Sequence, residues 1–311
     1  MRIFLAGATG AIGRQLVPAL RATGHEVIGT TRSMANGQWL EQAGAEPVVL
    51  DALDRDAVLR TVTAARPDVI VHQLTAIGAT DFRDLDGSFA MTNRLRTEAT
   101  DHLLDAAREA GVKRFVAQSF TGWPNERSGG PVKTEADPLD AQPARKSEQS
   151  LAAIRHVESA TTGARGIDGL ALRYGFLYGP GTAIGRGGEM VELIKKRQLP
   201  IVGGGAGIFS FVHVADAAAA TVAAVERGAA GIYNIVDDEP APAATWIPYL
   251  ADLLGAKAPR KVPAWLARPM LGELGINIMT RGRGSDNAKA KREFGWALTY
   301  PSWREGFRHL G

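Results

Sequence analysis

Residues 1–14 constrain the fold of this chain more than any other stretch. Residues 3–6 are consecutive apolar residues, which is typical of a strand buried on both faces of a sheet. The glycines Gly7, Gly10 and Gly13 follow at once, and residues 15–21 then read as a helix. A strand, a glycine turn and a helix in this order indicate a dinucleotide-binding unit.

Each glycine of this turn has its own expected role. Gly7 allows a tight turn, Gly10 lets a pyrophosphate come close to the backbone, and Gly13 lets the helix lie against the strand. Free amide groups at the helix N-terminus would then face the anion. The alternative is a tight strand-to-helix turn that binds no ligand.

Strands and helices continue to alternate from residue 26 to residue 236. Further strands are predicted at 26–31, 47–50, 68–74, 114–119, 169–174 and 231–236, and helices at 54–65, 87–110, about 151–160, 189–197 and 214–226. This alternation predicts an α/β fold with a doubly wound parallel Rossmann sheet.

The chain is predicted to divide into two parts. Residues 1–177 would form the dinucleotide-binding Rossmann domain, to which residues 213–236 return. Residues 178–212 and 237–311 would form a smaller, mostly helical C-terminal substrate lobe. The loop at 121–145 is rich in glycine and proline, and a loop of this length is usually a lid or a binding loop, with disorder as the alternative.

Composition excludes several classes of function. The chain of 311 residues has no cysteine, so it has no disulfide, no thiolate nucleophile and no cysteine metal site. Its net charge of +3 comes from scattered basic residues, which do not indicate nucleic-acid binding. The apolar run at 214–225 is shorter than a membrane span, and no spacing indicates a metal site. Because the first strand starts at residue 2, we expect no signal peptide and a cytoplasmic location.

The end of the second strand points to the cofactor. An acidic residue here would bind the ribose of NAD, but no acidic residue lies between Glu26 and Glu41. Arg32 could pair with the 2′-phosphate of NADP, and Ser33 could add a hydroxyl donor. We therefore predict NADP rather than NAD, with a solvated arginine as the alternative. Asp51 either reaches the adenine or only caps a turn.

Several motifs together resemble the extended short-chain dehydrogenase/reductase family, which includes sugar-nucleotide epimerases and dehydratases. They are Gly-Ala-Thr-Gly-Ala-Ile-Gly at 7–13, Thr92-Asn93 with 103–107, and the segments 111–116, 172–181, 211–216, 232–236 and 287–296. Their order and spacing resemble this family over nearly the whole chain.

The cofactor-binding residues are predicted from position in the fold and from this resemblance. They are Gly7, Thr9, Gly10, Ala11, Ile12, Gly13, Arg32, Ser33, Asp51, Ala52, Gln73, Leu74, Thr75, Asn93, Tyr174, Gly175 and Phe176. Asn93 is similar to a residue that orders polar groups behind the site, although its role could be only to bend the helix.

The chain departs from the family at the usual proton relay, a Tyr-x-x-x-Lys pair. In that pair the tyrosine exchanges a proton with the substrate oxygen and the lysine lowers the tyrosine's pKa. Alignment on Glu158 places Ser150 at the tyrosine and Ile154 at the lysine. Phe120 stands where a serine usually helps to bind the substrate oxygen. Lys146 is the nearest possible substitute for the lysine.

Other side chains are candidates for catalysis and substrate binding. Thr121 and Ser119 lie at the carboxyl end of a central strand and could polarise a carbonyl, or they could make ordinary strand-end hydrogen bonds. Trp123 could cover a substrate or only hold the loop. Tyr178 and His213 fall in family-like segments and are candidates for substrate contact.

The sequence thus predicts an atypical, NADP-preferring short-chain dehydrogenase/reductase. It would transfer hydride to or from a carbonyl or alcohol of a polar small molecule or nucleotide sugar. The alternatives are a redox-neutral epimerase or dehydratase with bound cofactor, and a non-catalytic NADP-binding sensor or scaffold. A small-molecule substrate is the expected partner, without nucleic acid or membrane, and the resemblance implies a possible homodimer.

Overall fold

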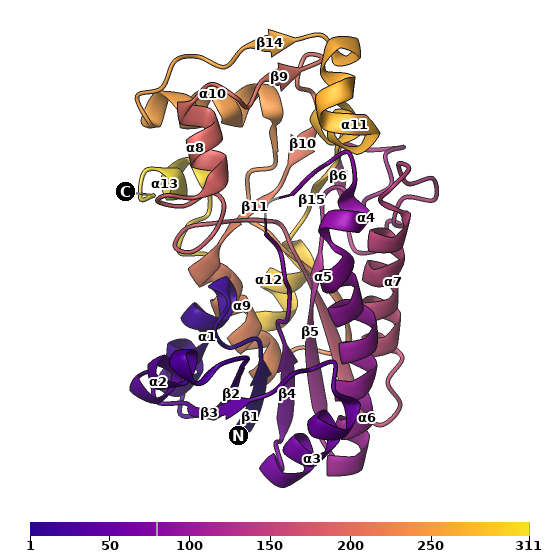
Figure 1. Ribbon diagram of the computed structural model, residues 1–311, viewed down its shortest axis with the longest axis vertical. Helices are drawn as coiled ribbons and strands as arrows, with labels where there is room; N and C mark the ends of the chain where they lie inside the picture. Colours follow the sequence, from indigo (N-terminus) through magenta and orange to yellow (C-terminus); the bar gives the residue numbers. More distant parts are fainter. Residues whose placement is uncertain (79, 311) are drawn as a thin grey trace.

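The computed structural model describes residues 1–78 and 80–310. A seven-stranded sheet with flanking helices forms the lower part of Figure 1, and helices with short strand pairs form the upper part. The sheet order is β12-β7-β5-β4-β1-β2-β3, and every neighbouring pair is parallel. The predicted doubly wound Rossmann fold is confirmed.

The predicted strands are present with small shifts at their ends. They are β1 (Arg2–Ala6), β2 (Glu26–Thr31), β3 (Glu46–Val49), β4 (Val69–His72), β5 (Arg114–Phe120), β7 (Asp168–Tyr174) and β12 (Gly231–Ile235). The chain moves outward from β1 to β2 and β3, and then returns to place β4 on the other side of β1. This reversal of strand order lies beside the glycine turn, where ligands bind in open α/β sheets.

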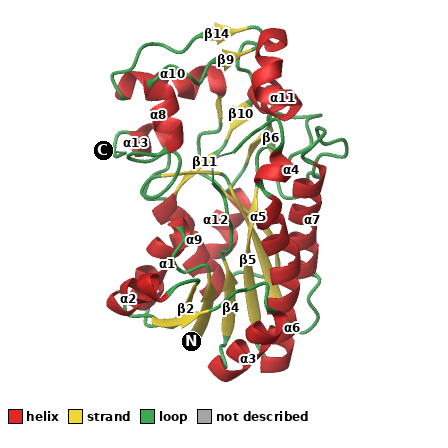
Figure 2. Ribbon diagram, in the orientation of Figure 1, coloured by secondary structure: helices red, strands yellow, loops and turns green. Residues whose placement is uncertain are grey.

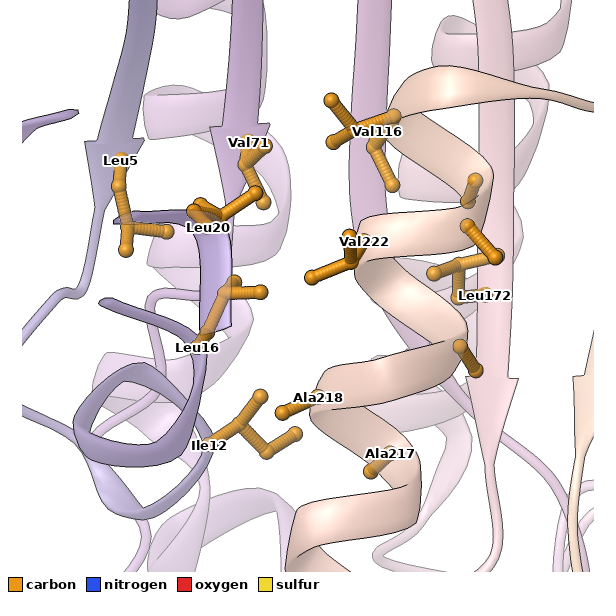
Figure 3. Packing of buried hydrophobic residues seen from close by; sticks show 14 of the residues in the cluster. Leu5, Ile12, Leu16, Leu20, Val71, Val116, Leu172, Ala217, Ala218 and Val222 are labelled. Atoms are coloured by element: carbon orange, nitrogen blue, oxygen red, sulfur yellow. The ribbon is translucent and has the colours of Figure 1, made fainter. Parts of the chain in front are cut away.

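Helices cover both faces of the sheet. On one face α1 (Ala11–Ala22) packs against α9 (Val214–Glu226), with α2 (Met34–Gln42) beside β3. On the other face lie α3 (Arg55–Ala65), α6 (Thr100–Ala110) and α7 (Glu148–Thr162). Figure 3 shows the first face, where Leu5 and Val71 of the strands meet Leu16 of α1 and Val222 of α9.

The helix predicted over 87–110 is interrupted. It consists of α4 (Leu85–Ser88), α5 (Ala90–Arg94), a π-helical turn (Leu95–Ala99) and α6. In the π turn the carbonyl of Leu95 accepts a hydrogen bond from Nε2 of His72, at 3.2 Å. Burial lowers the pKa of His72 to about 4, so this histidine is a neutral core residue at physiological pH.

The upper part of the molecule consists of helices and short strands (Figure 2). It has its own hydrophobic core, which includes Phe209, Phe211, Trp246 and Trp303. Its helices are α8 (Glu189–Lys195), α10 (Ala243–Leu253), α11 (Ala264–Arg281) and α13 (Trp303–Phe307). Its strand pairs are β9 (Ile201–Val202) with β14 (Lys261–Val262), and β10 (Ile208–Phe209) with β13 (Ala241–Pro242).

Two further strand pairs lie between the sheet and this lobe. β8 (Phe176–Tyr178) pairs with β11 (Phe211–His213), and β6 (Val132–Lys133) pairs with β15 (Gly284–Ser285). The second pair fixes the loop at 121–145 to the C-terminal part of the chain.

The C-terminal segment is an exception to the predicted lobe boundary. We expected all of 237–311 in the lobe, but α12 (Ala288–Phe294) packs beside β12 and α9. The ring of its apolar residue Phe294 packs at a tilt against that of Tyr233, with ring centroids 4.4 Å apart. Burial of these two rings stabilises α12 against the sheet, although the neighbouring parts of the chain belong to the lobe.

A buried ion pair joins α7 to β7. Both carboxylate oxygens of Glu158 accept hydrogen bonds from the guanidinium of Arg173, each at 2.7 Å. Both side chains are only 5% exposed. Removal of one partner would leave a buried charge without compensation.

We therefore expect Glu158→Ala to lower the free energy of unfolding by about 3–5 kcal/mol, the usual cost of breaking a buried pair. Glu98 pairs with Arg94 at 2.7 Å on an exposed helix face and provides the matched control. Glu98→Ala should cost little, because water screens exposed pairs. Urea unfolding of both variants measures the difference, and equal losses would contradict the assigned role of Glu158.

Candidate functional site

The glycine turn after β1 has the close backbone contacts that the sequence predicted. Gly7 has φ +91°, and its carbonyl accepts a hydrogen bond from the amide of Gly10 at 3.1 Å. A Cβ at Gly13 would lie 2.4 Å from the carbonyl oxygen of Gly7, so only glycine lets α1 approach the strand this closely.

Space remains open at Gly10, the N-cap residue that precedes α1. A Cβ there would meet only the carbonyl oxygen of Gly7, at 3.4 Å. Among the described residues no side chain caps the first amides of α1, and its first turn has no acidic residue. These amides and the open space beside Gly10 fit the pyrophosphate of a dinucleotide.

Arg32 and Ser33 follow β2 as predicted, and both are exposed. Within residues 1–78 and 80–310, the Arg32 guanidinium has neither a hydrogen bond nor an ion pair. Asp51 accepts a hydrogen bond from the amide of Leu53 at 3.0 Å, which is the turn-capping role considered as its alternative. The neighbouring Ala52 is buried.

The side chain of Tyr174 lies in the core. Its hydroxyl accepts a hydrogen bond from Nε2 of Gln73 at 2.9 Å and lies 2.6 Å from the Thr221 hydroxyl. Burial raises the pKa of Tyr174 to about 12. Gly175 follows, where a Cβ would lie 2.5 Å from the Ser210 carbonyl oxygen. Tyr174 and Gly175 could therefore contact a cofactor only through their backbone.

The position of the missing tyrosine is occupied by a hydrogen-bonded serine. Ser150 is fully buried, and its hydroxyl donates to Oδ1 of Asp86 at 2.8 Å. The same carboxylate accepts hydrogen bonds from the backbone amides of Ser150 and Gln149 and so caps α7. The amide group of Asn93 donates to the Ser150 hydroxyl at 3.1 Å.

The position of the missing lysine is apolar, since Ile154 is fully buried. Lys146, the nearest basic residue considered as a substitute, is exposed and lies 3.5 Å from the carboxylate of Asp84. Lys146 thus pairs with the residue that caps α4.

An aromatic pair stands where the family has its serine. Phe120 at the end of β5 contacts Phe176 edge to face, with ring centroids 5.3 Å apart. Both rings are half-buried. The carboxyl edge of the central strands, which faces the lobe in Figure 1, is therefore lined with apolar rings at this point.

The two candidate catalytic hydroxyls are buried and bonded. Ser119 is fully buried and donates to Oε1 of Glu158 at 2.7 Å. Thr121 is 1% exposed, and its hydroxyl lies 2.6 Å from that of Ser285 and 3.2 Å from Oδ1 of Asn125. Both groups make the strand-end hydrogen bonds that the sequence analysis left open as their alternative role.

The three candidate substrate residues have different surroundings. Trp123 is half-buried and lines a pocket between the loop after β5, α7 and α11. Tyr178 is fully buried against Phe307, and burial raises the pKa of its hydroxyl. His213 accepts a hydrogen bond from the amide of Ala215 at 3.2 Å and caps α9, and burial lowers its pKa.

Sequence reasoning missed the partners that hold this site together. Asp86 and Ser285 contact site residues that are far away in the sequence, and no local pattern marks them. Leu274 and Ile278 of α11 line the pocket but read as ordinary core residues. In the part of the chain that the structure describes, no three His, Asp or Glu side chains form a group that could hold a metal ion.

Residues 3–236 match the NAD dependent epimerase/dehydratase family. The chain belongs to this family. The predicted resemblance to the extended short-chain dehydrogenases/reductases is thereby confirmed. The family binds NAD(P), in agreement with the glycine turn.

Two relatives are named as reductases. The chain is 47% identical over 310 residues to a 3-diazoavenalumate denitrifying reductase of Streptomyces sp, covering 98% of this chain and 99% of the relative. It is 28% identical over 335 residues to a 4-hydroxy-2-methyl-3-oxo-4-farnesyl-3,4-dihydroquinoline-1-oxide ketoreductase of Stigmatella aurantiaca, covering 100% and 97%. This family member is an NAD(P)-dependent oxidoreductase.

Solved structures share the fold. The UDP-glucose 4-epimerase of Thermotoga maritima with UDP-glucose matches with a TM-score of 0.79 and 22% identity, over 100% of this chain and 97% of that one. A human epimerase family protein, SDR39U1, with NADPH matches with a TM-score of 0.75 and 20% identity, over 100% of this chain and 99% of that one.

Among the described residues, no helix combines the length and apolar character needed to cross a membrane.

The open space at Gly10 generates a prediction. Gly10 has φ −74° and ψ 175°, which an alanine adopts without strain, so Gly10→Ala should keep the thermal unfolding midpoint. Its methyl group would occupy the space assigned to the pyrophosphate, and NADPH should bind at least about tenfold more weakly. Fluorescence titration measures this affinity. Unchanged NADPH binding would show that the cofactor does not approach Gly10.

Proposed function

We propose that this protein is an NADPH-dependent reductase that removes dinitrogen from a diazo group on an aromatic ring. One observation carries the proposal: Ser150 and Ile154 occupy the two positions of the family's proton relay, and Phe120 occupies the position of its substrate-binding serine. The substrate class comes from the relative that is 47% identical and is named as a denitrifying reductase of a diazo compound.

The residues present fit the cofactor. Gly10 and the free amides of α1 would hold the pyrophosphate, and Gly13 permits the close helix approach. Arg32 would pair with the 2′-phosphate, with Ser33 beside it, which favours NADPH over NADH. The other predicted cofactor-binding residues remain part of this proposal.

The chemistry explains why a relay is unnecessary. Bound NADPH would supply a hydride with its electron pair to the ring carbon, while the C–N bond breaks and its electrons leave with neutral N₂. Ketone reduction creates a strongly basic alkoxide that needs a proton donor. Hydride addition to the neutral diazo compound with loss of N₂ instead leaves a C–H bond and a phenolate, a weakly basic anion that takes its proton from water afterwards. Replacement of the tyrosine and lysine by the buried Ser150 and Ile154 therefore removes no proton donor that the hydride transfer requires.

The aromatic pair has a role in the same reaction. Phe120 and Phe176 present half-buried rings at the carboxyl edge of the sheet. The faces of such rings attract cations, and a diazonium group carries a positive charge. An apolar wall also excludes water, which would otherwise compete with hydride for the activated carbon.

Ketone reduction is the second candidate, because another relative is named as a ketoreductase. In that reaction Thr121 or Ser119 would have to release its present hydrogen bonds to reach the substrate oxygen.

The cytoplasmic location, the homodimer and the redox-neutral epimerase reaction stay predictions.

The cofactor preference is tested by Arg32→Ala. Loss of a charge-assisted pair with the 2′-phosphate should reduce the preference for NADPH over NADH by about 1–3 kcal/mol. NADH affinity should stay the same, since NADH lacks that phosphate. Arg145, which is exposed and lies far from β2 in the sequence, provides the control variant Arg145→Ala. Equal weakening of both cofactors in Arg32→Ala would contradict the assignment.

The reaction is tested with the diazo compound made from methyl 3-amino-4-hydroxybenzoate and with NADPH deuterated at C4 of the nicotinamide. We expect one NADPH oxidised per N₂ released, and methyl 4-hydroxybenzoate with deuterium on the carbon that carried nitrogen. A reaction without enzyme corrects for direct reduction. Absence of enzyme-dependent turnover, or deuterium that comes only from solvent D₂O, would overturn the proposal.

A further inference from the structure

The first half of α11 presents large apolar side chains to solvent. Trp265, Leu266 and Met270 are 76%, 54% and 70% exposed, whereas Ala267 between them is buried. Among the described residues, Trp265 and Met270 are the two most exposed large apolar side chains. Exposed apolar side chains that gather in one place mark an interaction site, whereas single ones are ordinary surface.

The chain around this helix is basic. No acidic residue lies between Asp252 and Glu273, although this stretch contains four basic residues. They are Lys257, Arg260, Lys261 and Arg268, and all four are exposed. Within residues 1–78 and 80–310, none of the four pairs with a carboxylate. Their positive charge is therefore left to act on a partner.

Folding brings three more basic residues beside this stretch, at the end of α8. They are Lys195, Lys196 and Arg197, and all are exposed. Nε of Arg197 donates a hydrogen bond to the carbonyl of Ala258 at 2.7 Å, and β9, which follows, pairs with β14. Lys195 has a carboxylate partner, Glu192, at 3.2 Å. We call all seven basic residues, together with Trp265, Leu266 and Met270, the α11 surface.

The α11 surface lies at one end of the molecule's longest axis. In Figure 1, β9, β14 and the start of α11 form the top of the molecule, and the parallel sheet lies well below them. A surface at the end of the long axis can meet a flat partner without hindrance from the rest of the chain.

The composition of the α11 surface identifies the kind of partner. A second copy of this chain, bound through the same surface, would bring like charges together, which opposes association. Protein interfaces are depleted in lysine, but four of the basic residues here are lysines. Tryptophan and leucine beside lysine and arginine are instead the composition that binds at the surface of an anionic lipid bilayer.

We propose that the α11 surface binds reversibly to the face of an anionic phospholipid membrane. Trp265, Leu266 and Met270 would enter the headgroup region, and the basic side chains would pair with lipid phosphates. Such a contact is peripheral and needs no membrane-spanning helix, in agreement with the described helices. It differs from the expectation of no membrane partner, which treated the basic residues as scattered. They are scattered in the sequence, but the fold gathers these seven.

The test is co-sedimentation of the full chain with lipid vesicles. One set contains phosphatidylcholine alone, and the other contains equal amounts of phosphatidylcholine and phosphatidylglycerol. We expect binding to the anionic vesicles and little binding to the neutral ones. Binding should weaken as salt is added, because salt screens the attraction between exposed charges. No substrate takes part, so the result is independent of the proposed reaction.

Apolar variants locate the contact. Trp265→Ala should weaken binding to anionic vesicles at least about tenfold, because the tryptophan no longer enters the headgroup region. Met270→Ala should also weaken binding. Met34 on α2 is 66% exposed and provides the matched control, so Met34→Ala should bind as the original chain does.

Charge variants test the basic part of the surface. Arg260→Glu combined with Lys261→Glu should abolish binding to anionic vesicles. Arg66 at the end of α3 and Lys113 before β5 are also exposed and lie at the opposite end of the molecule. Arg66→Glu combined with Lys113→Glu changes the net charge equally and should keep most of the binding. NADPH affinity should be the same in all variants, which shows that each is folded.

Three results would overturn the proposal. The chain could bind neither kind of vesicle, or it could bind both kinds equally well. The third is equal weakening by Met270→Ala and Met34→Ala. Size-exclusion chromatography and titration with polyglutamate examine the other occupants. A dimer that Trp265→Ala dissociates, or binding to polyglutamate without binding to vesicles, would assign the surface to a second copy or to an acidic protein instead.

Discussion

The structure depends on close backbone contact around the first turn. A Cβ at Gly7 would lie 2.8 Å from backbone atoms of Gln73, and one at Gly13 would collide with the carbonyl of Gly7. Absence of these side chains lets β1, β4 and α1 meet at the point where strand order reverses. The first backbone amides of α1 are left without a side-chain cap at this point. The carboxyl ends of the central strands face the lobe (Figure 1).

The site keeps its shape although the family's proton relay is missing. Asp86 caps α7 through Ser150, so the helix that usually carries the tyrosine and lysine begins at a fixed place. Thr121 binds Ser285 across 164 positions of sequence and fixes the loop after β5 to the C-terminal part. The hydroxyls of Ser119 and Thr121 make hydrogen bonds within the protein, and the rings of Phe120 and Phe176 contact each other at the carboxyl edge of the sheet.

The strands and the glycine turn could be predicted because their signals are local. Residues 3–6 are buried on both faces as their apolar run indicates, and Asp54 caps α3 through the amide of Ala57 at 3.0 Å. No local pattern marks the interruption near Leu95, whose carbonyl accepts a hydrogen bond from His72 of a different element. The capping of α7 by Asp86 was missed for the same reason.

The residues of the candidate site also differ in whether the local sequence could predict them. Arg32 at the end of β2 was predicted to bind the cofactor from one short segment, and the structure leaves its side chain exposed. Ser119 and Thr121 were correctly placed at the carboxyl end of β5, but their partners Glu158 and Ser285 come from tertiary packing. The pocket beside Trp123 requires α11, which follows more than a hundred residues later in the chain.

The central claim is that hydride transfer in this protein needs no proton from the enzyme. The most direct measurement is the rate of NADPH oxidation in a single turnover with the diazo compound, in H₂O and in D₂O, across neutral pH. The account predicts equal rates in both solvents and no dependence on an ionising side chain. A rate that falls markedly in D₂O and follows the titration of one group would contradict it, because a proton donor would then take part in the reaction.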